Sequence, residues 1–125
     1  MENFRQFDAG PDPFGRTWNV QLKWMQTAIS IRHSDTVDAK FIMESEGERH
    51  QKLVAIPHTH LLGLSKESGT PMTDAWCSRL AAIHLKHIIE TGEDLEKDLV
   101  TPSPAQLREY NQQLKSAGLT QALPY

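Results

Sequence analysis

The chain has 125 residues, of which 38% are hydrophobic and 23% are charged, and its formal net charge is −3. This length and composition predict one soluble globular domain over residues 1–125 and exclude a largely disordered chain. The Lys and Arg residues are scattered singly along the chain. Proteins that bind nucleic acid usually gather such residues on one face, so we expect no nucleic-acid partner.

The sequence also bears on the cellular compartment. Cys77 is the only cysteine, so no disulfide can form within the chain, and a reducing compartment is favoured. The first residues lack a basic segment followed by an apolar stretch, so we expect no signal peptide. Apolar runs are only a few residues long, so we expect no membrane partner. Together these features predict a cytoplasmic protein, with the bacterial cytosol as the default.

The first half of the chain predicts a sheet over about residues 17–57, after an irregular segment over about residues 1–16. Two prolines and two glycines between Asp8 and Gly15 oppose a helix and a central strand. From residue 17 to residue 31 the pattern has period two, but the apolar positions change from even, as at Trp18 and Trp24, to odd, as at Ile29. This change of face predicts a β-bulge or a break between residues 25 and 28.

Two more strands are predicted, over residues 37–44 and about residues 50–56. For the first connection, parity favours a three-residue loop over residues 34–36, which pairs Ile31 with Ala39 and Ile29 with Phe41. For the second, a two-residue loop at Glu46 and Gly47 places Val54 and Ile56 opposite Ala39 and Val37. The result is an antiparallel meander with one apolar face, which needs a cover.

Helices predicted over about residues 58–125 supply this cover. Residues 58–66 suggest a short helical turn that buries its leucines. The main helix is expected to begin at Thr70 as N-cap, with Pro71 at its first position, and to stop at Gly92. Ser103, Pro104 and Gln106 predict a capping box for a last helix, which is expected to stop at Gly118.

The main helix is apolar around much of its circumference. Its stripe is widened near the C-terminal end by Leu85, Ile88 and Ile89. Such a helix is either buried on two sides or faces a second subunit, and we expect a homodimer. The fold class is therefore α+β: a three-stranded antiparallel meander, or four segments if the first strand is broken, with a bulged first strand and helices packed on one face, in the order β-β-β-α-α.

Six histidines raise the question of a metal site. His58 and His60 follow the third strand closely, and His84 and His87 lie one helical turn apart on the main helix. These four residues are the candidate ligands, for zinc, nickel or iron, if residues 57–66 fold back over the main helix. His84 and His87 also lie on or beside the apolar stripe, which favours a structural role. We therefore commit to no metal and no cofactor.

Other chemistry has weaker support. Cys77 lies beside Trp76 on the main helix, where a small buried hydrophobic residue is the usual role. The sequence contains no Gly-x-Ser-x-Gly turn, no P-loop and no Gly-x-Gly-x-x-Gly motif, which argues against the nucleotide cofactors that such loops hold. We therefore expect a non-catalytic binding or assembly module that takes a small ligand or a protein partner. A small metal-dependent enzyme that uses the four histidines is the alternative.

Overall fold

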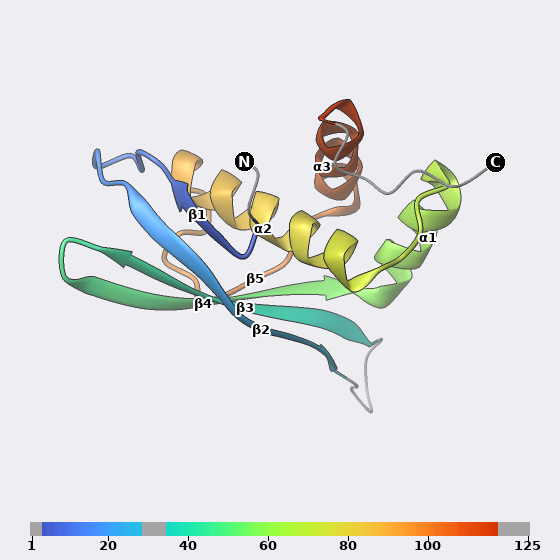
Figure 1. Cartoon of the computed structure of the whole chain (residues 1–125), viewed down its shortest axis with the longest axis horizontal. Helices are drawn as coiled ribbons and strands as arrows, with labels where there is room; N and C mark the ends of the chain where they lie inside the picture. The colour runs from blue at the N-terminus through green and yellow to red at the C-terminus, as the bar shows by residue number, and fades with distance from the viewer. Residues whose placement is uncertain (1–3, 29–34, 118–125) are drawn as a thin grey trace.

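A computed structural model describes residues 4–28 and 35–117. Within them the elements are β1 (Gln6–Ala9), β2 (Trp18–Ala28), β3 (Thr36–Ser45), β4 (Glu48–Pro57), α1 (His58–Ser68), α2 (Asp74–Thr91), β5 (Leu99–Val100) and α3 (Pro104–Ser116). The strands form one sheet in the order β1-β2-β3-β4-β5, in which β1 to β4 are an antiparallel meander and β5 joins β4 in parallel. The helices lie on one side of this sheet (Figure 1), so the predicted α+β class is confirmed.

Two short strands at the edges of the sheet were not predicted. β1 lies in the segment that was expected to be irregular, and it pairs only with β2. Its inward residues, Phe7 and Ala9, are buried. β5 is two residues long, and its Val100 is buried beside β4. A strand of two to four residues is too short to establish a period in the sequence, so only its pairing identifies it.

The bulge in β2 exists, but its predicted position is wrong. The register of β2 against β3 shifts between Leu22 and Trp24, and pairing is regular from Trp24 to Ala28. Trp24 therefore lies on the outer face, 36% exposed, with the Lys40 ammonium 5.9 Å from the centroid of its ring. The sequence pattern assigned Trp24 to the apolar face, and this assignment moved the expected bulge toward the C-terminus.

The predicted first connection is also wrong. Thr36 is already part of β3 and pairs with Ala28, so residues 34–36 are not the loop. Ala39 pairs with Met25 and Phe41 with Leu22, in place of Ile31 and Ile29. Residues 29–34 lie outside the described residues.

The second connection is confirmed. Ser45 pairs with Glu48, which leaves the two-residue loop of Glu46 and Gly47. Both loop residues have positive φ, 49° and 83°, as the twist of a two-residue hairpin requires. Val37 faces Ile56 and Ala39 faces Val54, as parity predicted.

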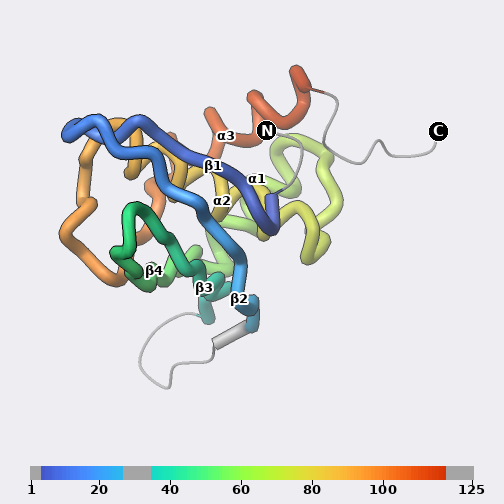
Figure 2. The backbone as a smooth tube through the Cα atoms, turned by 60° about the vertical axis from the view of Figure 1, so that its left-hand side comes forward, coloured from blue at the N-terminus to red at the C-terminus, as the bar shows by residue number. Residues whose placement is uncertain are grey.

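Helix α2 is buried on two sides. One side packs on β1, β3 and β4, and the other side contacts α3, which also contacts α1. Figures 1 and 2 show α3 lying above α1 and α2, away from the sheet. The Trp76 indole Nε1 donates to Asn111 Oδ1 at 3.0 Å and joins α2 to α3. Leu85, Ile88 and Ile89 are thus buried within the chain, which covers the apolar surface that suggested a dimer; the homodimer itself stays a prediction.

The helix ends agree in part with the sequence. α1 is a full helix rather than a short turn, and it buries Leu61 and Leu64 but not Leu62. α2 begins with Thr73 as N-cap, whose hydroxyl accepts from Trp76 N, so the prediction of Thr70 is wrong. Its end at Gly92 and the capping box of α3 are confirmed, while the predicted stop at residue 118 lies outside the described residues. None of these helices combines the length and the apolar character needed to cross a bilayer.

The first prediction concerns the glycines that end α1 and α2, Gly69 and Gly92, which both have left-handed φ, 69° and 76°. A Cβ on Gly92 would lie 2.7 Å from Pro13 Cγ, whereas a Cβ on Gly69 would meet nothing within 4 Å. Each Gly→Ala change should destabilise the fold by about 1 kcal/mol through backbone strain. Gly92→Ala should cost more, because it also displaces Pro13. Urea unfolding measures both; equal losses would contradict the packing of residues 10–17 on the end of α2.

Candidate functional site

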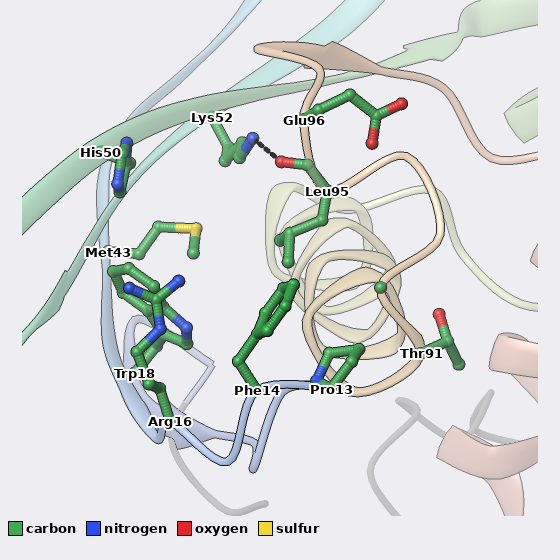
Figure 3. Close-up of a pocket in the computed structure, with 11 residues that line it drawn as sticks. Pro13, Phe14, Arg16, Trp18, Met43, His50, Lys52, Thr91, Leu95 and Glu96 are labelled. Atoms are coloured by element: carbon green, nitrogen blue, oxygen red, sulfur yellow. Dashed lines mark hydrogen bonds between the residues drawn. The ribbon is translucent and has the colours of Figure 1, made fainter.

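A cleft lies where α2 stops before it has covered the end of the sheet. Its volume is about 580 Å³. One wall is the loop between β1 and β2, the second is the inner face of β2, β3 and β4, and the third is the end of α2 with the segment that follows it (Figure 3). Its apolar lining comes from all three walls: Pro13, Phe14, Trp18, Met43 and Leu95.

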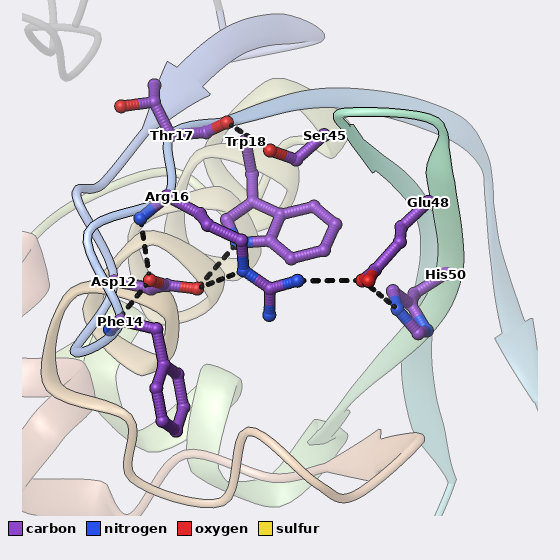
Figure 4. A network of polar contacts seen from close by, with 8 residues as sticks. All are labelled: Asp12, Phe14, Arg16, Thr17, Trp18, Ser45, Glu48 and His50. Carbon is purple, nitrogen blue, oxygen red and sulfur yellow. Dashed lines mark hydrogen bonds and ion pairs between the residues drawn. The ribbon is translucent and has the colours of Figure 1, made fainter.

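The loop between β1 and β2 is organised by the buried carboxylate of Asp12. Its Oδ1 accepts from the backbone N–H groups of Phe14 and Arg16, each at 2.9 Å. Its Oδ2 accepts from the Trp18 indole Nε1 at 3.0 Å and from Arg16 Nε at 3.3 Å (Figure 4). The indole hydrogen bond above all, with the backbone N–H groups and the Arg16 charge, holds the pKa of Asp12 below its ordinary value, although burial opposes this shift.

Arg16 connects this loop to the hairpin of β3 and β4. Its guanidinium lies over the Trp18 ring, 4.8 Å from the centroid, and its Nη1 is 2.8 Å from Glu48 Oε2. The same carboxylate oxygen lies 3.4 Å from His50 Nε2. The hydrogen bond from His50, followed by that from Arg16, lowers the pKa of Glu48. Arg16 is therefore held by two carboxylates and one ring, and it is a fixed part of the cleft wall.

The sheet contributes two polar side chains to the cleft. His50 pairs with Met43, and Lys52 pairs with Phe41, so both lie on the inner face with the core residues of β4. Lys52 is a buried residue, and its ammonium donates to the carbonyl oxygens of Leu95 and Lys97. These bonds fasten the segment after α2 to the sheet and fix the far wall of the cleft.

Phe14 is the apolar side chain of the cleft that the fold itself does not need. It is 80% exposed, the highest value among the large hydrophobic side chains of the described residues. Its ring projects toward Leu95 across the mouth of the cleft (Figure 3). An aromatic ring held in water beside an apolar cavity is a common feature of ligand sites, because burial by the ligand is favourable.

The histidines named from the sequence lie elsewhere. His58 and His60 are in the first turn of α1, and His84 and His87 are on α2. Among the residues that the structure describes, no group of three or more His, Cys, Asp and Glu side chains is arranged to hold a metal ion. His60 faces a hollow between α1 and α3, and its buried Nδ1 has no hydrogen-bond partner among the described groups.

His84 and His87 belong to the contact between α2 and α3. Their rings stack at 6.4 Å between centroids, and His84 Nδ1 is 2.8 Å from the Tyr110 hydroxyl. His87 Nε2 is 3.2 Å from Glu93 Oε2 at the surface. Cys77 is buried, as expected, and burial raises the pKa of its thiol to about 11, so the thiol stays protonated near neutral pH.

Sequence reasoning missed the residues of the cleft. One signal was available for two of them: His50 and Lys52 occupy even positions, as do the core residues Val54 and Ile56, so all four were due on the inner face. Polar residues on the inner face of the sheet indicate that the helices do not extend over that part of the face. Asp12 and Arg16 carried no such signal, because their roles depend on how an irregular loop folds.

The second prediction concerns Asp12. Because the folded pKa lies below the unfolded value, the carboxylate stabilises the fold above pH 4, and this stabilisation is lost as the pH falls through the folded pKa. Asp12→Asn should therefore be destabilised relative to the wild type at pH 6, and the gap should shrink in acid. Chemical unfolding between pH 6 and pH 2 measures it. Asp8→Asn, which changes an exposed carboxylate nearby, is the control and should have a smaller effect. A gap that does not depend on pH would refute the prediction.

The third prediction concerns His84. Burial, and then the charge of His87, lower the pKa of His84 from 6.5 to about 4. The unfolded chain thus binds a proton between pH 6.5 and pH 4 that the folded chain does not, and stability should fall by up to about 3 kcal/mol as the pH drops across this window. Urea unfolding of His84→Gln should show a flatter pH profile, while the surface variant His87→Gln should retain most of the slope. Identical slopes in wild type and His84→Gln would contradict this.

Among the described residues, the cleft is the candidate site with the most apolar lining, and comparison with known proteins gives no further indication of function. No family model matches the chain, and no curated protein and no solved structure is significantly similar to it.

Proposed function

We propose that the chain is a non-catalytic binding module whose cleft takes a small, largely apolar ligand. The observation that carries this proposal is an open cleft of about 580 Å³ with a largely apolar lining, beside a fixed polar frame. Ligand sites in proteins commonly have volumes of 300–1,000 Å³ and combine an apolar lining with a few polar groups. The cleft has both properties.

The hydrogen bonds of the frame support binding by a preformed site. Asp12 accepts four hydrogen bonds from its own loop and from Trp18. Arg16 also binds Glu48, which is 32 residues away in the sequence, and so connects the loop to the hairpin. These contacts hold the Trp18 ring at the cleft. A ligand that enters a site of this kind loses little affinity to the ordering of protein side chains.

The same contacts support binding rather than catalysis. Among the described residues that line the cleft, only Thr91 has an aliphatic hydroxyl group. This hydroxyl donates a hydrogen bond to the His87 carbonyl at 2.7 Å. His50 is paired with Glu48, and within residues 4–28 and 35–117 no serine, threonine or cysteine joins them in a nucleophile–base pair. Asp12, Arg16 and Glu48 are engaged in holding the walls of the cleft.

The fourth prediction tests the cleft with phenylbutanol, a neutral molecule with an aromatic ring and a short chain. The protein has three tryptophans, and only Trp18 lines the cleft, while Trp24 is on the outer face and Trp76 is between α2 and α3. In heteronuclear NMR spectra, titration should shift the indole N–H signal of Trp18 and leave the other two in place. Saturable shifts at Trp24 or Trp76 instead would overturn the proposal.

Phe14→Ala is the matching variant. Because the ring is exposed, its loss should change stability by no more than about 0.5 kcal/mol. It should weaken phenylbutanol about fivefold, as expected for the loss of one aromatic contact. Leu62→Ala removes an exposed apolar side chain on α1, outside the cleft, and should leave the affinity unchanged. Equal affinities for wild type and Phe14→Ala would remove Phe14 from the site.

A further inference from the structure

Lys52 is a buried charge without an ion pair. The residue is 5% exposed, and its Nζ donates to the Leu95 carbonyl at 2.5 Å and to the Lys97 carbonyl at 2.6 Å. None of the ion pairs among the described residues includes it. A buried charge is costly unless an opposite charge or several hydrogen bonds compensate for it, so an ammonium at this position needs a physical reason.

The two hydrogen bonds that hold the segment after α2 explain only part of the need for a lysine at this position. An ammonium has three protons to donate, and the two carbonyl oxygens accept two of them. A neutral amide could donate the same two hydrogen bonds without a desolvated charge. Burial lowers the pKa of Lys52, while Asp98 and Glu96 oppose the shift from a distance. Among the described residues, no acceptor takes the third proton and no carboxylate lies within ion-pair distance of the ammonium.

This ammonium group lies in the wall of the cleft. Lys52 lines it together with Met43, Trp18 and Leu95, so the ammonium is next to apolar surface (Figure 3). The other permanent cation of the cleft, Arg16, is bound by Asp12 and Glu48 and has its face on Trp18. Glu96 is on the exposed rim, where water and salt screen its charge. Lys52 is thus the cation that a ligand inside the cleft can use.

We propose that the ligand of the cleft is a small carboxylate with an apolar or aromatic body, and that the Lys52 ammonium binds its carboxylate group. This inference rests on the proposed function and specifies its ligand class. A carboxylate in the cleft accepts the third proton and forms a close ion pair with the ammonium, next to apolar side chains that reduce its contact with water. Its body lies against Trp18, Met43 and Phe14, which account for the rest of the lining.

The test uses three molecules with one carbon skeleton: phenylbutyrate, phenylbutanol and phenylbutylamine. Titration calorimetry at fixed ionic strength gives the three affinities, and the Trp18 indole signal confirms the site of binding. We expect phenylbutyrate to bind at least about tenfold more tightly than the alcohol, and the amine to bind more weakly than the alcohol. This comparison uses the unaltered protein, so it does not depend on the folding of a variant.

Lys52→Gln then assigns the preference to one residue, because the amide keeps hydrogen-bond donors but loses the charge. In this variant phenylbutyrate and phenylbutanol should bind with about equal affinity. The ratio of the two affinities is the readout, because any shift of the wall that Lys52 holds affects both molecules. Lys40→Gln makes the same change of net charge on the outer face of the sheet and should retain the preference.

The outcomes separate the two proposals. If none of the three molecules binds at Trp18, the proposed function fails, and this inference fails with it. If the alcohol or the amine binds as tightly as the carboxylate, the cleft is a ligand site but not a carboxylate site. If Lys52→Gln keeps the preference, Lys52 is not the residue that recognises the carboxylate.

Discussion

Helix α2 is apolar around most of its circumference, and the need to bury this surface on two sides determines the arrangement of the other elements. The sheet covers one side, and because β1 to β4 cannot reach the other, α3 covers it. Leu80, Leu85 and Ile89 are almost completely buried between these layers. Burying a side chain of this size contributes about 1.5–3 kcal/mol, far more than any surface ion pair in the chain. The three-layer order follows from this constraint.

The cleft follows from where that helix ends. α2 stops at Gly92 in a left-handed conformation, and the chain turns away before the helix has covered the hairpin of β3 and β4. Inner-face residues beyond this point lack a helical cover, and the loop around Asp12 closes over them only in part. Since Pro13 packs on Gly92, the same residue that ends the helix also positions the loop. One backbone feature therefore sets two walls of the site.

The charged side chains of the cleft differ in their partners: some form ion pairs with one another, and Lys52 does not. Asp12 and Glu48 both bind the guanidinium of Arg16, and Asp12 also accepts from the Trp18 indole, so these groups hold Trp18 and the loop. Lys52 has only carbonyl dipoles as near partners. Desolvation disfavours an isolated ammonium more than two neutral acceptors can offset, which is why the ligand proposed for the cleft carries the opposite charge.

Periodicity in the sequence predicted the strands β3 and β4 and the helices α2 and α3, whereas it indicated only a short turn where α1 forms. Alternation in β3 and β4 and the two-residue loop at Gly47 were sufficient for the register Val37–Ile56, because a one-residue slip would have turned every core side chain outward. The capping box at Ser103 and the stop at Gly92 are local hydrogen-bonding and backbone effects, so they are also visible in the sequence. The bulge was detectable only as a change of parity, and its position depended on whether Trp24 packs inward.

The tertiary structure alone decided the rest. Trp24 lies outward because Lys40 and the register of β3 place it there, and β5 exists only because α2 returns the chain to the edge of β4. His50 and Lys52 followed the parity of the core, yet whether a helix covers that part of the face depends on where α2 lies. The contact of Arg16 with Glu48 joins a loop to a hairpin 32 residues away. A pattern of neighbouring residues records local geometry, whereas a site of this kind depends on distances across the fold.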